Sequence, residues 1–304
     1  IALQNLIYCT MMSLGSWWFS GWPPSWHINL QPLRGMIGFS SKILATNIFT
    51  HINNNIFSIF FGRLYGEKTV GYYNQANKWT TMGSNTLVGM LWSVTQPLFA
   101  RFDKDDMERM QRVFRKLLRF TAFLSCPALF GLGLIAPEFI TIAMQLLCIG
   151  GAFMPISSFY ANFVISQGKS NVFMWNTIAL CLAQMLLLVI LYPYGVEAMV
   201  IAYVVVNTLW LFVWHWFVKR LIGIRFLHAL RDVLPFVLIA AVAMAAGWGM
   251  SQLSGGNIYL SLLLKMVGAV IAYILLLRLL GAEILNECTE FVKSKIPFKF
   301  KRKV

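Results

Sequence analysis

The sequence has little charge. Asp, Glu, Lys and Arg make up only 12% of its 304 residues, whereas soluble domains carry about 25% charged residues. Hydrophobic residues make up 58%, and they gather in runs of about 20 residues, long enough to cross a hydrocarbon core of about 30 Å as helices. This composition excludes a water-soluble fold and predicts an all-α polytopic membrane protein.

Acidic residues are especially scarce, with 11 against 25 basic residues and a net charge of +14. The basic residues lie between the apolar runs and in the C-terminal tail, where they act as signals of membrane orientation. We therefore attribute the positive charge to the membrane and expect no nucleic-acid partner.

Motifs for catalysis and metal binding are absent. The five cysteines have no short pair spacing, and the four histidines form neither HxxxH nor HExxH. The sequence also lacks GxSxG, a glycine-rich loop for phosphate and a carboxylate pair in a loop. We therefore expect no catalytic residue, no metal site and no cofactor, and we interpret the protein as not an enzyme.

Nine apolar segments are separated by Pro, Gly and polar residues, and each predicts a membrane-spanning helix. The segments are residues 1–22, 36–61, 79–100, 117–142, 144–166, 172–192, 196–218, 233–253 and 258–280. The stretch from Phe120 to Ser166 needs two of these helices but offers no turn between Thr141 and Leu146. We infer that a loop near residues 141–146 is missing from the sequence.

The basic residues fall on one side of the predicted membrane. One set of alternate loops and the tail hold 20 Lys and Arg, and the opposite set holds three, Arg63, Lys68 and Lys78. Because basic loops are retained in the cytoplasm, the C-terminus is expected there. Nine spans then place Ile1 on the outer side, so we expect further spans before it.

The segment RFDKDDMERMQRVFRKLLRF, residues 101–120, has an acidic start and a basic end. Its apolar residues recur at helical spacing and are Met107, Met110, Val113, Phe114 and Leu117. The pattern predicts an amphipathic helix that lies on the cytoplasmic membrane surface before the chain enters the next span.

Polar residues cluster in the second apolar segment, within THINNNIFSIFFGRLYG at residues 50–66. On a helix, one face within about 60° of a line through Ser40 collects a polar set: Asn47, His51, Asn54, Asn55 and Ser58. Two interpretations stay open, the wall of a hydrated cavity or hydrogen bonding to another helix. Asn53 points off this face and fits the second.

Charged and amide residues in other spans are weaker candidates. Lys42 could either bind a ligand or extend to the membrane surface, and Lys265 lies about 10 Å deep by the helical rise. Asn176, Gln184 and Asn207 are expected to make hydrogen bonds between packed helices.

Two stretches carry a resemblance to a known family. Residues 21–79, which end in GRLYGEKTVGYYNQANKW, resemble the middle of Wzx-like polysaccharide and lipopolysaccharide flippases of the multidrug/oligosaccharidyl-lipid/polysaccharide exporter superfamily. Residues 95–120, TQPLFARFDKDDMERMQRVFRKLLRF, resemble the cytoplasmic segment that follows in that family. The phrase from Gly62 to Trp79 is the most specific part.

The resemblance implies the C-terminal part of a two-lobed flippase of about 12 to 14 helices. The implied parts are the last helix of the N-terminal lobe (1–22), a cytoplasmic linker (23–35), a six-helix lobe (36–219), two extra helices (220–281) and a basic cytoplasmic tail (282–304). The implied function is export of a polyprenyl-diphosphate-linked oligosaccharide across the bacterial inner membrane by alternating access. Its partners would be that lipid-linked oligosaccharide, membrane lipids and other polysaccharide assembly proteins.

On this reading the polar face of residues 36–61 contacts the sugars, and basic side chains contact the diphosphate. The diphosphate candidates are Lys42, Arg63, Lys78 and Lys265. Many relatives carry an acidic residue near the Asn-rich turn, where this chain has Asn53, Asn54, Asn55 and Ser58, so ion coupling stays open. Two alternatives remain, a drug or small-molecule exporter of the same superfamily and a membrane polymerase or ligase of polysaccharide.

Overall fold

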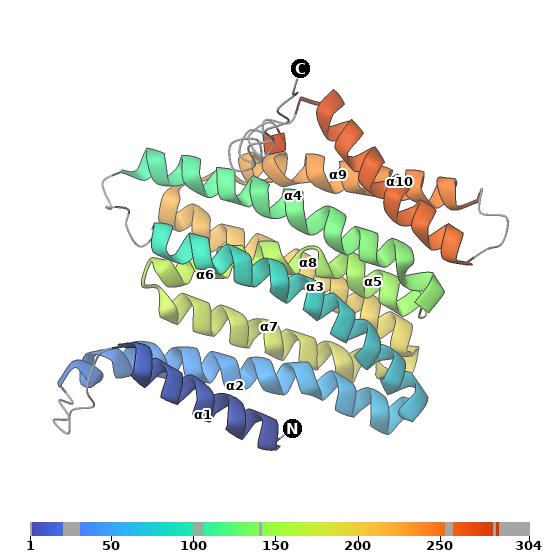
Figure 1. The fold of residues 1–304 in the computed structure, drawn as a ribbon. Coiled ribbons are helices and arrows are strands. Elements are labelled where there is room, and N and C mark those ends of the chain that lie inside the picture. Colours follow the sequence, from blue (N-terminus) through green and yellow to red (C-terminus); the bar gives the residue numbers. More distant parts are fainter. Residues whose placement is uncertain are drawn as a thin grey trace. The chain divides into compact units, whose positions relative to one another are not determined.

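The computed structural model describes residues 2–20, 31–99, 102, 106–139, 142–252, 258–281 and 284–285 (Figure 1). These residues form mostly α-helices, and none of them lies in a strand. The prediction of an all-α protein is therefore confirmed. Of the basic tail predicted for residues 282–304, nearly all lies outside this described part.

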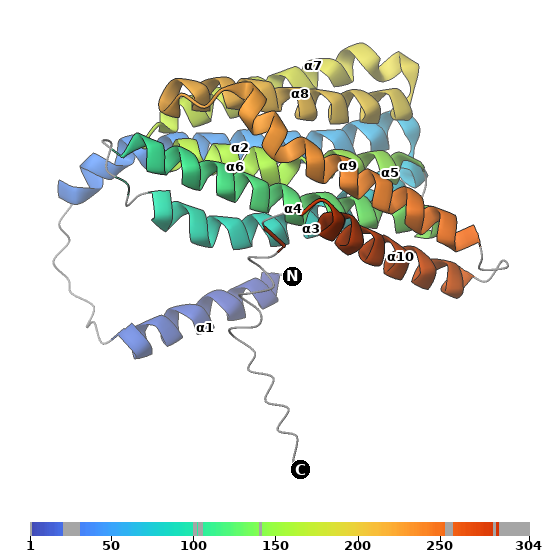
Figure 2. The same ribbon diagram turned by 90° about the horizontal axis from the view of Figure 1, so that it is seen from above.

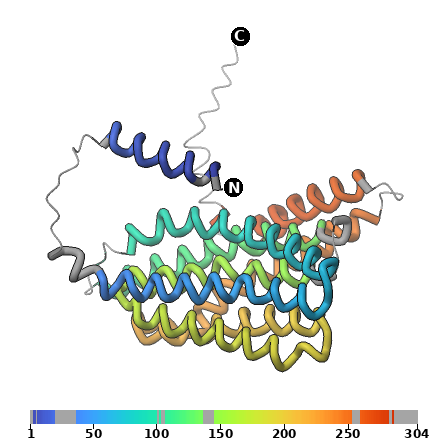
Figure 3. The backbone as a smooth tube through the Cα atoms, turned by 90° about the horizontal axis from the view of Figure 1, so that it is seen from below, coloured from blue at the N-terminus to red at the C-terminus, as the bar shows by residue number. Residues whose placement is uncertain are grey.

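The chain divides into two compact units, Ile1–Ser41 and Lys42–Val304. The first unit holds α1 (Ala2–Ser20) and the beginning of α2 (Gln31–Tyr65), at the blue end of the trace in Figure 3. Apolar side chains of α1 such as Leu6, Met11 and Trp18 are exposed. The second unit contains the rest of α2 and all later helices.

A single residue, Gly66, separates α2 from α3 (Glu67–Phe99). Its φ of +84° is left-handed, a conformation that glycine adopts without the steric cost of a Cβ. Beside this turn Phe61 and Tyr73 pack edge to face, with ring centroids 4.7 Å apart. The loop predicted over residues 62–78 was wrong, because its polar residues lie on the exposed face of a helix that buries its other face.

α4 (Met107–Phe139) takes in most of the segment predicted to lie on the membrane surface. Met110 and Phe114 are 1% and 0% exposed. The ring of Phe114 lies 4.9 Å from each of the rings of Phe159 and Phe163. At these two positions the apolar stripe packs against protein, whereas Met107 is exposed and Val113 and Leu117 are half-buried. The placement of this segment on the membrane surface stays a prediction.

The helix predicted over residues 144–166 is broken near its middle, into α5 (Ile142–Gly151) and α6 (Met154–Ser166). A turn at Ala152 and Phe153 separates them. Pro155 follows at once and has no N–H to continue the hydrogen bonds of α5. Residues 140–141, part of the join that lacked a turn in the sequence, lie outside the described residues.

The remaining helices pack as pairs. α7 runs beside α8, and α10 beside α9, as Figures 1 and 2 show. Their bounds are α7 (Ser170–Leu191), α8 (Val196–Ile222), α9 (Phe226–Ser251) and α10 (Ile258–Leu279), with a 3-10 turn at Tyr192–Tyr194 after α7. α4 packs against both α9 and α10 and thereby connects this pair to the other helices.

Six segments of the described residues are long and apolar enough to cross a membrane. They are Met107–Ile135, Gln145–Ser166, Ser170–Tyr194, Val196–Ile222, Phe226–Ser251 and Tyr259–Leu279. The chain is a multi-pass membrane protein. The spans predicted in α1, α2 and α3 are not among these six, and α2 and α3 are also the helices that carry long polar faces.

Candidate functional site

The polar face of α2 is exposed in the unit Lys42–Val304. Four of its five predicted cavity residues, Asn47, His51, Asn54 and Asn55, are exposed, and Ser58 is half-buried. α2 packs against α7 and α8 through a neighbouring face instead. The predicted residues thus form one exposed strip along a helix that is otherwise flanked by apolar side chains.

α3 continues this polar surface. The Ser58 hydroxyl donates a hydrogen bond to Asn74 Oδ1 across 2.6 Å. Lys78 lies one helical turn beyond Asn74, and Asn54 lies one turn before Ser58. α2 runs toward Gly66 and α3 runs away from it. A step back along α2 and a step forward along α3 therefore both lead away from the turn, which places Lys78 and Asn54 at similar heights along the two helices. Figure 1 shows that α2 and α3 move apart with increasing distance from this turn.

The four basic residues predicted to contact a diphosphate are not brought together. Lys42 is half-buried and Arg63 is exposed, and the two are about 30 Å apart along α2 by the rise of a helix. Lys78 is exposed on α3. Lys265 is only 6% exposed on α10 and lines an apolar pocket between α4, α9 and α10. Of these four, Lys78 is the one on α3, one helical turn beyond Asn74, whose side chain accepts from Ser58 of the polar face.

A chain of amides connects α2 to two other helices. Asn53 Nδ2 donates to Gln184 Oε1 on α7 at 2.5 Å, and Gln184 Nε2 donates to Asn207 Oδ1 on α8 at 3.1 Å. Asn53 and Gln184 are 5% and 2% exposed. The prediction that Asn53, Gln184 and Asn207 make hydrogen bonds between helices is confirmed, as it is for Asn176, which accepts from Trp210 at 2.7 Å.

A polar pocket of about 170 Å³ adjoins the break between α5 and α6. Its polar lining comes from α3, α6 and α8: Ser84, Asn85, Ser157, Ser158 and Asn207. Asn207 therefore belongs both to this pocket and to the amide chain from α2. In a membrane, non-helical backbone is tolerated where it lines a cavity or is buried in protein. The turn between α5 and α6 meets both conditions.

Glycine permits the close packing around this pocket. A Cβ on Gly151 would lie 2.3 Å from Cγ2 of Thr80, and the Ser84 hydroxyl donates to the Gly151 carbonyl at 3.4 Å. Sequence reasoning missed the pocket. The signal available was the run CIGGAFMPISS at residues 148–158, where paired glycines and a proline interrupt an otherwise apolar span.

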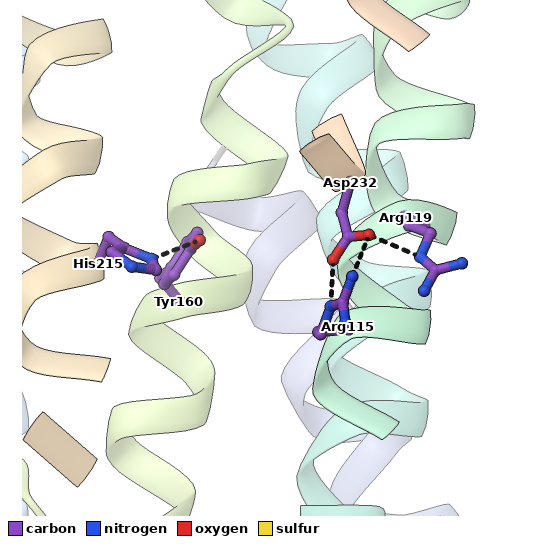
Figure 4. Close-up of polar contacts among 5 residues, drawn as sticks. All are labelled: Arg115, Arg119, Tyr160, His215 and Asp232. Carbon is purple, nitrogen blue, oxygen red and sulfur yellow. Dashed lines mark hydrogen bonds and ion pairs between the residues drawn. The ribbon is translucent and has the colours of Figure 1, made fainter. Parts of the chain in front are cut away.

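An ion-paired cluster joins α4 and α9 (Figure 4). Arg115 contacts both carboxylate oxygens of Asp232, at 2.6 and 3.0 Å, and Arg119 Nε lies 3.0 Å from Oδ1. The sequence prediction missed Asp232, although it is the only acidic residue between Glu197 and Glu283.

A second buried pair, also drawn in Figure 4, joins Tyr160 of α6 to His215 of α8, with 3.3 Å between the hydroxyl and Nδ1. Nε2 of His215 has no hydrogen-bond partner among the described residues. The pair lies on the opposite side of α6 from Asp232 in that view. It is consistent with hydrogen bonding between packed helices.

No set of three or more His, Cys, Asp or Glu side chains in the described ranges is arranged to hold a metal ion. Cys126, Cys148 and Cys181 are buried free thiols. The exposed side chains of the polar face and of Asn74 and Lys78 beside it carry amides, an imidazole and an ammonium, all of which can form hydrogen bonds.

Residues 1–145 match the family described as polysaccharide biosynthesis protein. The lipopolysaccharide biosynthesis protein WzxC of Escherichia coli (strain K12) is 23% identical over 160 residues, which cover 49% of this chain and 32% of WzxC. A membrane protein in the cps region of Klebsiella pneumoniae is 26% identical over 158 residues, covering 48% of this chain and 32% of that protein.

The similarity to both relatives spans about a third of their length. The family match over residues 1–145 includes the polar face of α2. No solved structure matches the chain.

Proposed function

We propose that this chain, whose residues 1–145 match the polysaccharide biosynthesis protein family, is the C-terminal part of a flippase for lipid-linked oligosaccharide. The transported molecule would be a polyprenyl-diphosphate-linked oligosaccharide used to assemble cell-surface polysaccharide. The observation that carries the proposal is the exposed polar face of α2, with Asn47, His51, Asn54 and Asn55, in an otherwise apolar membrane protein. Transport changes the position of the substrate and no covalent bond, so the proposal needs no catalytic residue.

Sugars suit this face chemically. Hydroxyl groups both donate and accept hydrogen bonds, and so do the amides of Asn54 and Asn55 and the imidazole of His51. A lone amide facing lipid costs several kcal/mol, so an exposed row of them favours contact with water or a polar substrate. Neutral partners can exchange hydrogen bonds as a sugar chain moves, without the cost of separating paired charges.

Basic residues supply the complementary charge for a diphosphate. Lys78 is favoured, because it is exposed and level with Asn54 on the neighbouring helix. Arg63 and Lys42 lie near the two ends of the same polar face and would contact the diphosphate before and after it crosses. Lys265 is the weakest of the four candidates because it is buried on α10.

The parts of the chain would follow the two-lobed plan. Residues 1–22 would end the N-terminal lobe, residues 36–219 would form the C-terminal lobe, and residues 220–281 would be two extra helices. The face of α2 would then line the cavity between lobes, and alternating access would follow from rocking of one lobe against the other. The protein would reside in the bacterial inner membrane with its C-terminus in the cytoplasm, beside other polysaccharide assembly proteins.

Export of surface polysaccharide tests the proposal. In the full-length protein, His51→Leu, Asn54→Leu and Asn55→Leu together should abolish export while the protein still inserts in the membrane, measured by surface polysaccharide in cells that lack their own copy. A matched control changes the exposed apolar side of the same helix, with Ile48→Leu, Ile52→Leu and Ile59→Leu.

The control variant should export normally. Unchanged export by the polar-face variant, at equal protein levels, would refute the cavity assignment. Loss of resistance to cationic drugs with polysaccharide export intact would instead favour a small-molecule exporter.

A further inference from the structure

A basic pocket of about 670 Å³ lies between α4, the start of α9 and the end of α10. Its charged lining consists of Arg115, Arg119, Arg231 and Asp232, with His228 beside them. These helices are not the ones that carry the exposed polar face, which belongs to α2 and α3. The basic pocket is therefore separate from the proposed oligosaccharide path.

Among the described residues that line the basic pocket, positive charge exceeds negative charge. Three guanidinium groups line it together with one carboxylate from this part of the chain. Asp232 is only 5% exposed and contacts both Arg115 and Arg119, whose side chains are 31% and 34% exposed. The carboxylate thus holds two arginines in fixed positions while each keeps part of its surface open. Arg231, which is exposed, adds a third cation at the rim.

The lining changes from charged to apolar along the helices. On α9, Arg231 and Asp232 come within the first turns after Phe226, and Phe236 and Ile239 follow farther along. By the helical rise, Asp232 lies about 9 Å from the first residue of α9. Leu277 adds an apolar wall from the last turn of α10. Charges near the helix ends and apolar groups deeper in match the order of headgroup and acyl chain in a phospholipid.

We propose that the basic pocket binds the phosphate group of an anionic phospholipid, with the start of an acyl chain against Phe236 and Ile239. Guanidinium groups bind phosphate oxygens through pairs of parallel N–H bonds. Basic pockets between membrane helices bind anionic headgroups in this way. A soluble phosphate would use the arginines but would leave the apolar wall without a partner.

Lipid binding to the full-length protein tests this assignment. Native mass spectrometry would compare dioleoylphosphatidylglycerol with dioleoylphosphatidylcholine, and sodium pyrophosphate would serve as the soluble phosphate probe. We expect preferential binding of phosphatidylglycerol, about fivefold weaker in Arg231→Gln because each basic residue near anionic lipid contributes about that factor. Arg231→Glu should remove the preference. Both variants spare the Arg115–Asp232 pair, so folding should be kept.

Arg220→Gln is the matched control. Arg220 is exposed near the end of α8 and lies over the ring of Trp216, 3.8 Å from its centroid, and it does not line the basic pocket. Unchanged phosphatidylglycerol binding in this control supports the site. Equal losses in Arg220→Gln and Arg231→Gln, or equal binding of the two lipids by the wild-type protein, would overturn it. Binding of pyrophosphate that needs Arg231, without lipid preference, would overturn it in favour of a soluble phosphate.

Discussion

The two polar regions of the unit Lys42–Val304 differ in how their groups are paired. On α2, the imidazole of His51 and the amide of Asn54 are exposed on the helix surface. Between α4 and α9, Asp232 is buried, and the guanidinium of Arg115 contacts its carboxylate at 2.6 Å. The first region can exchange hydrogen-bond partners at little cost, whereas the second holds two helices in one arrangement. The exposed groups on α2 therefore suit contact with a moving substrate, whereas the buried ion pair between α4 and α9 suits a structural role.

The same contrast exists within α2 on adjacent residues. Asn53 is buried and bonded to Gln184, and Asn54 is exposed. Identical side chains one position apart thus have different roles, set by which face of the helix each occupies. Substitutions at the two positions should consequently separate stability from transport.

The largest effect is expected at Asp232. Asp232→Asn leaves two guanidinium groups without their carboxylate and should lower the free energy of unfolding by about 3 kcal/mol, below the upper end for buried pairs because both arginines are partly exposed. Thermal unfolding in detergent measures it. The double variant Arg115→Gln with Asp232→Asn should lose less than the sum of the single losses. Additive losses would show that the pair contributes little.

A smaller loss, about 2 kcal/mol, is expected for Gly151→Ala. The new methyl group would lie 2.3 Å from Cγ2 of Thr80, and such overpacking typically costs 1–3 kcal/mol, so the estimate is about the middle of that range. Thr80 cannot turn away freely, since its hydroxyl donates to the Ala76 carbonyl at 3.0 Å.

Two variants control this prediction. Thr80→Ser in the Gly151→Ala background removes Cγ2 and should restore most of the thermal stability. Gly71→Ala, where no atom lies within 4 Å of the added group, should not destabilise the protein. Equal destabilisation by Gly71→Ala would mean that helix flexibility, and not the contact with Thr80, is responsible.

The smallest effect on stability is expected on α2, and it tests the contrast between neighbours. Asn53→Leu removes the buried hydrogen bond that Asn53 donates to Gln184. This change should lower the free energy of unfolding by about 1 kcal/mol. Asn54→Leu should leave thermal stability nearly unchanged and should reduce polysaccharide export. We expect Asn53→Leu to have the larger effect on thermal stability and Asn54→Leu the larger effect on export. If one variant had the larger effect in both assays, the distinction between the two faces of α2 would be removed.

Much of the fold could be predicted because it depends on local pattern. Apolar runs gave the bounds of α7, α8 and α10 within a few residues, whereas α4 and α9 begin well before their predicted starts. Helical geometry put five polar residues on one face: Asn47, His51, Asn54, Asn55 and Ser58. The turn at Gly66 was misplaced, because residues such as Asn74 and Lys78 are typical of loops and equally suit an exposed helical face. Periodicity also could not tell that Phe114 faces Phe159 and not lipid, since both surroundings are apolar.

The candidate site could be predicted only in part, for a related physical reason. A polar row on one helix is visible in the sequence, and so is an amide that departs from it, such as Asn53. The partners are not, because Gln184 lies 131 positions away and Asp232 lies 117 positions from Arg115. Pairing over such distances depends on helix packing, which a single sequence does not encode in its local spacing.

Cysteine labelling measures whether water reaches the polar face of α2. In the full-length protein with its native cysteines replaced, His51→Cys and Asn54→Cys would be compared with Ile52→Cys by labelling in membranes with a charged, water-soluble maleimide. The account predicts rapid labelling at the two polar-face positions, slowed by lipid-linked oligosaccharide, and little labelling at Ile52→Cys. Labelling at His51→Cys and Asn54→Cys as slow as at Ile52→Cys would contradict the claim that this face lines a hydrated path for substrate.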